Sequence, residues 1–197
     1  AAISVKQIND ETMHMLELAY ENVNQAFGQL LQFSDKIDEQ IYKREDTVNY
    51  LDKVISEYIS TALATPNLNV NISQALSSYY LMLVDIERIS DYAVNMNHQA
   101  TKRLQGDMTI SEIEIVEHMK KLCVDMKNDL DDVEEAERKD DVIDSLVSSW
   151  REAQIQALKQ KKCSSEVSMM LSRIFTDFER INDHALNVSQ ELDKITV

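Results

Sequence analysis

The sequence predicts an all-α protein: a tandem pair of three-helix bundles, six helices in all, related by a pseudo-twofold repeat. Two observations carry this prediction. The 197 residues include only two Gly and one Pro, too few for the tight turns of a sheet protein, whereas residues that tolerate helix well are abundant. An eleven-residue pattern also occurs twice, and self-similarity at one fixed offset indicates an internal duplication.

The repeated pattern is D-x-E-R-I-x-D-x-A-x-N. It occupies residues 85–95 and, at an offset of 92, residues 177–187. On a helix, Glu87, Asp91 and Asn95 are spaced i, i+4 and i+8 and therefore form one polar line. The Ile and Ala positions fall on an adjacent face and are expected to pack inward. Each copy thus combines a packing stripe with acids at fixed spacing.

Apolar residues at helical spacing predict three helices in the first half, residues 1–105. Ser34 and Asp35 supply the stop after the first helix and the N-cap of the second. Tyr58 is placed in the apolar stripe of the second helix, and Pro66 opens the loop before the third. The expected ranges are about 5–33, 36–64 and 71–104.

The strongest break in the chain is at Gly106, between the two copies of the pattern. It divides the chain into a first repeat, residues 1–105, and a second repeat, residues 106–197. Thr109 and Glu112 then form a T-x-x-E capping box that opens the fourth helix.

Three helices are expected in the second repeat as well. The acidic run 129–137 is predicted to break the chain between the fourth and fifth helices. Leu158 is placed on the apolar side of the fifth helix, and Ser164 or Ser165 is expected to cap the sixth. The fourth helix is expected to end near residue 129, the fifth near 161 and the sixth near 194.

The net charge of −15 restricts the classes of partner. It argues against nucleic acid and against docking on an anionic membrane leaflet, because both repel an acidic protein. It also argues against the capture of free phosphate as the main task. Cations and basic partner surfaces are the natural counterparts, although a solvated acidic surface explains much of the charge by itself.

The two cysteines and the uncharged segments indicate no disulfide framework and no membrane span. Cys123 and Cys163 have no metal-ligand spacing, and we expect ordinary thiols in a reducing compartment. The longest uncharged run, residues 58–84, contains a proline and three asparagines, so it is not expected to cross a bilayer. No signal peptide opens the chain, and a start at Ala1 suggests an excised fragment.

The second helices of the two repeats also correspond, with residues 45–51 aligning with residues 140–146 at an offset of 95. Each repeat then carries acids or amides at i, i+4 on two neighbouring helices. Carboxylates packed this closely repel one another unless a cation lies among them. The candidate metal ligands are Glu45, Glu87 and Asp91 in the first repeat, and Asp140, Asp144, Glu179 and Asp183 in the second.

An alternative without metal stays open: a solvated acidic ridge in which Arg88 and Arg180 pair with neighbouring acids. If metal is bound, the second set is expected to be the better site, because Asn49 supplies no charge to the first. No His joins the acidic lines at ligand spacing.

The tandem third-helix pattern, preceded by an E-D-x-V-N-x-L type second helix, resembles the PhoU family over essentially the whole chain. The resemblance implies two similar three-helix bundles side by side and a role in the control of bacterial phosphate uptake. It also implies acidic motifs that can hold multinuclear iron or zinc clusters. The implied partners are the membrane portion of a phosphate transporter or a complex of transporter and kinase. A second copy of the chain, in a homodimer, is a further partner that the resemblance allows.

This sequence departs from the family pattern at two kinds of position. Asn49 stands where the family motif has Asp, which weakens the first site. Ser90 and Asn182 stand where a Gly usually follows E-R-I. We expect this second change to affect helix packing rather than chemistry.

Two contexts exist for such a chain within the family. One is a free-standing regulator that works with an ABC phosphate importer and a sensor kinase. The other is the cytosolic tail of bacterial sodium/phosphate cotransporters. Residues 11–23 resemble the segment that follows the membrane part of those cotransporters, and the extension usual at the end of free-standing members is missing after Val197.

We therefore expect a non-enzymatic regulatory domain of a sodium-dependent phosphate cotransporter, cytoplasmic and tethered to the inner face of the membrane. The alternatives are the free-standing regulator and a metal-free helical scaffold or dimerisation module. Catalysis has little support, because no Gly-rich phosphate loop or nucleophile motif is visible. A di-metal bundle enzyme would need Glu-x-x-His pairs, and neither Glu87 nor Glu179 has a His three residues on.

Overall fold

The computed structural model describes residues 4–196. These residues form six long α-helices and one short 3-10 helix, joined by connections. No strand occurs within these residues, so the all-α prediction is confirmed. The elements are α1 (Val5–Leu31), α2 (Asp35–Leu63), α3 (Val70–Ala100), η1 (Gln105–Asp107), α4 (Ile110–Asn128), α5 (Val133–Lys159) and α6 (Ser165–Asp193).

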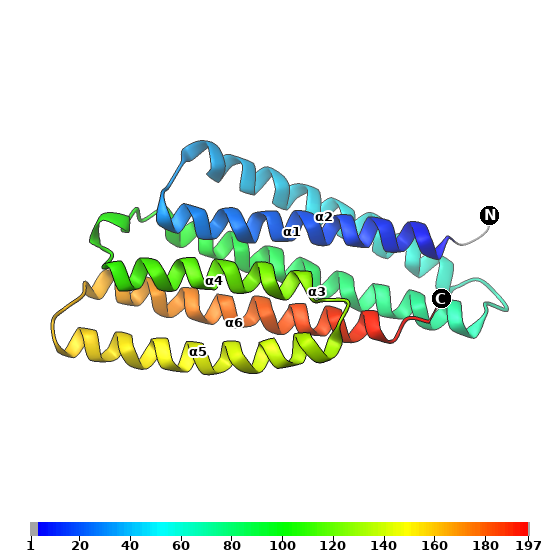
Figure 1. Cartoon of the computed structure of the whole chain (residues 1–197). Helices are drawn as coiled ribbons and strands as arrows, with labels where there is room; N and C mark the ends of the chain where they lie inside the picture. The colour runs from blue at the N-terminus through cyan, green and yellow to red at the C-terminus, as the bar shows by residue number, and fades with distance from the viewer. Residues whose placement is uncertain (1–3, 197) are drawn as a thin grey trace.

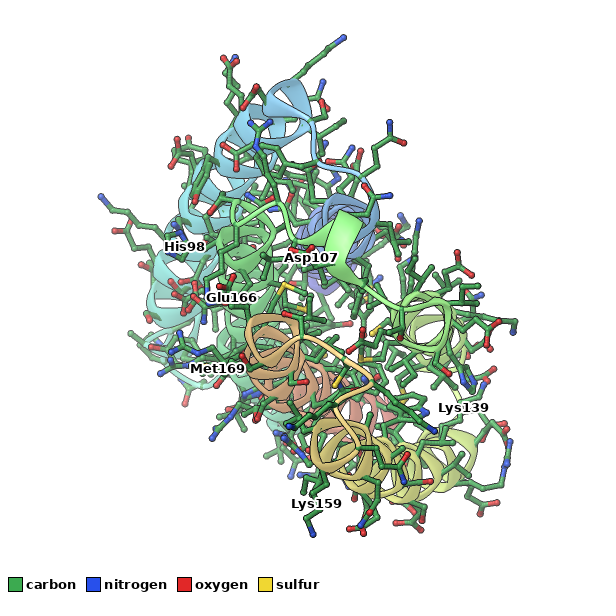
Figure 2. The ribbon with its side chains drawn as sticks, turned by 90° about the vertical axis from the view of Figure 1, so that its left-hand side faces the viewer. His98, Asp107, Lys139, Lys159, Glu166 and Met169 are labelled. Atoms are coloured by element: carbon green, nitrogen blue, oxygen red, sulfur yellow. The ribbon has the colours of Figure 1, made fainter. Side chains whose placement is uncertain are left out.

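The six helices run along one long axis, and successive connections alternate between the two ends of the molecule (Figure 1). α3 and α6 lie at the centre, pack against each other and run in opposite directions. α1 packs on α3 and α4, while α2 and α5 lie at opposite extremes when the bundle is viewed end-on (Figure 2). The two motif-bearing helices therefore form most of the contact between the first three helices and the last three, and α1 with α4 adds to it.

Helix ends follow the capping signals of the sequence. Ser34 caps α2 by accepting a hydrogen bond from the backbone N–H of Ile37, and Ser164 caps α6 in the same way. Thr109 and Glu112 form the reciprocal capping box at the start of α4. α3 ends at Ala100, earlier than expected, and Arg103 then adopts φ 53°, a left-handed conformation that cannot continue the helix.

Residues 129–137 were predicted to separate the fourth helix from the fifth. This is wrong for residues 133–137, which are helical. α5 begins at Val133, and the carboxylate of Asp132 caps it by accepting from the N–H of Glu135. Glu134 and Glu135 lie in the first turn, where the helix dipole stabilises negative charge. The acidic run is therefore mainly a helix N-terminus rather than a loop.

One continuous apolar core joins both repeats. Phe27 of α1 meets Phe178 of α6 edge-on at 6.3 Å between ring centroids, and Trp150 of α5 stacks on Phe175 at 6.0 Å. The prediction that the Ile and Ala positions of the motif pack inward is confirmed on α3, where Ile89 and Ala93 are buried. Four further residues continue the same buried stripe: Leu76, Tyr79, Leu83 and Ile86.

The outer helices bury a narrower stripe than their sequences predict. Tyr58 of α2 is 44% exposed and Leu158 of α5 is 39% exposed, so their placement in the core is wrong. Because α2 and α5 pack on one side only, residues at the margin of each apolar stripe face solvent. The division of the chain near Gly106 stays a prediction.

No helix within residues 4–196 is both long enough and apolar enough to cross a membrane.

Candidate metal centre

The polar lines of the two motif copies lie on the central helices, and each faces a flanking helix that carries acids of its own. α3 faces α2 in the first repeat, and α6 faces α5 in the second. Two acidic clusters result. We call them the first cluster, built around Glu45 and Asp91, and the second cluster, built around Asp140 and Asp183.

The second cluster brings carboxylate oxygens within ligand distance of one another. Three carboxylate oxygens lie within 4.8 Å of one another, one each from Asp140, Asp141 and Asp144. Asp183, from α6, lies within hydrogen-bonding reach of Asp140. Three of the four residues predicted for this site are thus gathered at one place, on two helices.

The electrostatics of the second cluster favour a bound cation. Burial, and after it the neighbouring carboxylates of Asp183 and Asp144, together raise the pKa of Asp140 to about 7. Burial and Asp183 also raise the pKa of Asp144. The Oδ1 atom of Asp140 is buried without a hydrogen-bond partner. A cation among these oxygens would satisfy that atom and relieve the repulsion.

Glu179, the fourth predicted ligand, differs from the others because it has a cationic neighbour. Burial raises its pKa, and the Arg151 guanidinium, 3.7 Å away, acts in the opposite direction. Asp144 and Asp183 raise the pKa of Glu179 again. Glu179 therefore borders the cluster and is shared between it and Arg151.

The first cluster gathers the predicted Glu45, Glu87 and Asp91. Burial, and after it the neighbouring Asp91, raise the pKa of Glu45 to about 7. The pKa of Glu87 is also raised, by burial first and then by Asp91 and Asp52. Hydrogen bonds from Ser90 and Asn49 oppose the rise at Glu45. The acids of this cluster are thus partly satisfied by neutral donors of the protein.

Ser90 corrects one expectation about the departures from the family pattern. Its hydroxyl donates a hydrogen bond to Glu45 Oε2, so the change from Gly affects a candidate ligand directly. Asn182, the equivalent residue, behaves as expected. It is buried and donates to the carbonyl of Phe178 at 2.8 Å, with the thiol of Cys123 at 3.7 Å.

Two cluster acids were missing from the prediction. Asp52 lies on α2, and its pKa is raised by burial and by Asp91. Asp141 lies beside Asp140 and contributes an oxygen to the second cluster. The helical register contained a signal for Asp52, since it follows Asn49 by three residues on the same face.

The local pairing expected for a metal-free ridge is not formed in the described part of the chain. Arg88 and Arg180 have no ion pair with a motif acid there. The positive charge of Arg88 lowers the pKa of Glu87 by electrostatic attraction without a direct ion pair. The guanidinium of Arg180 lies over the Tyr92 ring, 6.0 Å from its centroid.

The donors gathered in the second cluster are all carboxylate oxygens. Oxygen-only sets suit hard cations such as Mg²⁺, Ca²⁺ and Mn²⁺, and carboxylate-rich helix bundles hold iron. Zinc sites more often include Cys or His. The residues present therefore fit a cation, and they fit iron better than zinc.

Comparison with known proteins agrees with the repeat. The family model described as the PhoU domain matches residues 12–100 and matches again over residues 110–192. This chain belongs to the PhoU family. The PhoU match falls once on each side of Gly106, and each stretch contains one copy of the eleven-residue pattern.

Named relatives and solved structures of PhoU proteins cover nearly the full chain. A Thermotoga maritima protein named phosphate-specific transport system accessory protein PhoU homolog 1 is 23% identical, over 94% of this chain and 84% of its own length. The crystal structure of PhoU from Pseudomonas aeruginosa has a TM-score of 0.84 at 19% identity, covering 95% of this chain and 94% of that one. The phosphate transport system regulatory protein PhoU from Streptococcus pneumoniae has a TM-score of 0.81 at 18% identity, covering 95% and 92%. The likeness to these structures shows a shared fold.

Proposed function

We propose that this PhoU-family chain is a non-enzymatic regulator of phosphate transport that acts with an ABC-type phosphate importer and its sensor kinase. The observation that carries the proposal is the alignment with a phosphate-specific transport system accessory protein over 94% of this chain. The regulator would act in the cytoplasm, against the inner side of the importer.

The relatives support this context over the tail of a sodium/phosphate cotransporter. The resemblance to cotransporter tails lies in residues 11–23, which are part of α1. Nearly all of that stretch also lies inside the first family match, residues 12–100. Because that stretch is part of the PhoU match itself, a resemblance there does not distinguish the two contexts.

We also propose that the second cluster holds a divalent or trivalent cation, with Asp140, Asp144 and Asp183 as ligands. Support comes from the unpartnered buried oxygen of Asp140, and from the burial and the repulsion by Asp183 and Asp144 that raise the pKa of that residue. A bound cation would supply positive charge between α5 and α6. The protein's own part is to hold the three carboxylates in register on two helices, with Glu179 available at the border.

A gene deletion with complementation tests the regulatory role. In the native host, phosphate uptake is measured in phosphate-rich and phosphate-poor medium, with and without the gene for this chain. We expect the deletion to abolish most of the difference between the two media, and the wild-type gene to restore it. Affinity capture of the chain after cross-linking in cells should yield the importer's ATPase subunit or the kinase. An unchanged response of uptake to phosphate supply would contradict the proposal.

A further inference from the structure

A groove of about 330 Å³ lies where the end of α5 meets the start of α6. Buried Phe175 lines it, together with three exposed apolar side chains. Ile155 is 47% exposed, Leu158 39% and Met169 63%. Figure 2 looks onto this end of the molecule, with Met169 coming from α6 and Lys159 from the end of α5.

Small side chains on α6 make the groove, and the first repeat lacks them. Ser168 and Ser172 line it, and at the offset of 92 their counterparts on α3 are Leu76 and Tyr80. The groove is therefore a property of the second repeat and not a consequence of the PhoU fold itself. Two large side chains replaced by serines leave open the space between the two helices.

Buried hydrogen bonds hold the wall of the groove in place. Gln154 of α5 is 8% exposed, and its side-chain amide donates to Ser168 Oγ at 2.7 Å and to Glu112 Oε2 at 2.5 Å. At one end, Arg151 donates to the hydroxyl of Ser172 at 3.3 Å. Because polar contacts across three helices position these residues, the groove is pre-formed, which lowers the entropic cost of binding.

Arg151 lines the groove, and more basic side chains follow it closely in the sequence of this strongly acidic chain. Leu158 and Ser165, which line the groove, are joined by a short connection in which every lysine is exposed. The corresponding connection of the first repeat, residues 64–69, carries no charged side chain. The nearest acids in sequence are Glu152 and Glu166. The exposed lysines are Lys159, Lys161 and Lys162.

We propose that this groove docks an acidic amphipathic helix of a partner protein. One or two large apolar side chains of that helix would enter the groove, and its carboxylates would face the exposed lysines. The concave shape suits the insertion of single side chains, whereas a membrane surface calls for apolar residues that project outward. The net charge of −15 also opposes an anionic membrane. The proposal goes beyond the regulatory role and does not depend on metal.

The test uses the full chain and a synthetic probe. The probe is a labelled helical peptide of about 16 residues, with Leu and one Phe on one face and Glu on the other. A matched peptide carries Lys in place of every Glu. Fluorescence anisotropy is measured for both peptides at low and at physiological salt. We expect the Glu peptide to bind and the Lys peptide not to bind, with weaker binding at higher salt.

Two variants locate the binding. Ser172→Tyr places in the groove the side chain that α3 carries at the equivalent position, and it should weaken binding by about tenfold or more. The triple change Lys159→Gln, Lys161→Gln and Lys162→Gln should weaken it similarly. The matched control removes three exposed lysines elsewhere and should bind as the wild type does: Lys6→Gln, Lys53→Gln and Lys194→Gln. Circular dichroism and thermal melting check that each variant is folded.

Four outcomes would overturn the proposal. The first is equal binding of the Glu and Lys peptides, and the second is Glu-peptide binding that Ser172→Tyr leaves unchanged. The third is binding to phosphatidylglycerol vesicles that the triple lysine variant abolishes, which would assign the surface to a membrane. The fourth is concentration-dependent dimerisation that Ser172→Tyr abolishes, since a second copy would then occupy the groove. None of these bears on the uptake experiment, so the two proposals fail separately.

Discussion

His184 Nδ1 lies 2.8 Å from Asp85 Oδ1, so the eighth residue of the second motif copy contacts the first residue of the first copy. Asn187 also donates to Asp85 Oδ1, at 3.1 Å. The antiparallel arrangement of α3 and α6 makes these contacts available. Tyr92, the counterpart of His184 in the first copy, stacks on the His184 ring at 5.8 Å between centroids. The duplicated motif thus forms part of the contact between the two repeats.

Replacing His184 by Tyr, the residue at the equivalent position 92, should destabilise the protein. The change removes a partly buried hydrogen bond to a carboxylate, worth about 1.5–3 kcal/mol. For a chain of this size the melting temperature should fall by roughly 3–10 °C. Differential scanning calorimetry measures the change, and His98→Tyr, at an exposed site, is the control. Equal melting temperatures would show that the contact contributes nothing.

Without bound metal, the stability of the protein should decrease as pH rises from about 4 to about 7. The folded-state pKa values of Glu45 and Asp140 are raised to about 7, mainly by burial, so the folded state keeps these protons over a range in which the unfolded chain loses them. Both groups are partly exposed, and after screening by solvent the expected cost is about 1–2 kcal/mol for each. Urea unfolding across this pH range in the presence of a chelator measures the effect.

The double variant Glu45→Gln with Asp140→Asn removes both titrations and is the matched control for that experiment. It should be more stable than the wild type at pH 7.5 and should lose part of the slope between pH 4 and 7. Asp177, whose pKa burial raises to about 6, should keep part of the slope in both proteins. A wild-type stability that stays constant or increases across this range would contradict the electrostatic account of the two clusters.

Replacing Asn49 by Asp should turn the first cluster into a stronger cation site. Asn49 opposes the rise in the pKa of Glu45, and an aspartate there removes that donor and adds a charge. The metal-free variant should be about 1 kcal/mol less stable than the wild type, and it should bind additional cation. Isothermal titration with Mn²⁺ measures the binding. Asn49→Ala, which removes the donor without adding charge, should bind no more than the wild type.

Arg151→Gln should strengthen cation binding at the second cluster. The guanidinium lies 3.7 Å from Glu179, and its removal leaves that carboxylate free to serve as a ligand. An increase in affinity of about tenfold corresponds to roughly 1.4 kcal/mol of lost repulsion and competition. Competition with a fluorescent chelator gives the affinity, and Arg173→Gln on the exposed face of α6 is the control. If Arg151→Gln bound the cation more weakly than the wild type, Glu179 would not be a ligand that Arg151 keeps from the cation.

The sequence predicted the fold and the location of both clusters because the relevant signals are local. Helical periodicity, the caps at Ser34 and Thr109, and the i, i+4 spacing of the motif acids depend only on neighbouring residues. The acids of two adjacent helices were therefore expected to meet, and the structure brings Asp140 and Asp183 together.

The features that the sequence did not predict depend on how one helix is rotated against another. Periodicity defines an apolar stripe but not its buried width, so Tyr58 and Leu158 were placed inside although they are exposed. Individual side-chain contacts between helices could not be predicted from the sequence either. The pairing of Arg151 with Glu179 and the contact of His184 with Asp85 each join residues far apart in the chain.

The metal content of two matched double variants tests the central claim most directly. The protein is purified without chelator, and bound metals are measured by inductively coupled plasma mass spectrometry. Asp140→Asn with Asp183→Asn removes two charges from the second cluster and preserves side-chain shape, while Glu45→Gln with Asp91→Asn does the same in the first. We expect the second-cluster variant to lose its metal and the first-cluster variant to keep most of it. Equal metal in the second-cluster variant and the wild type would contradict the assignment of these carboxylates as ligands.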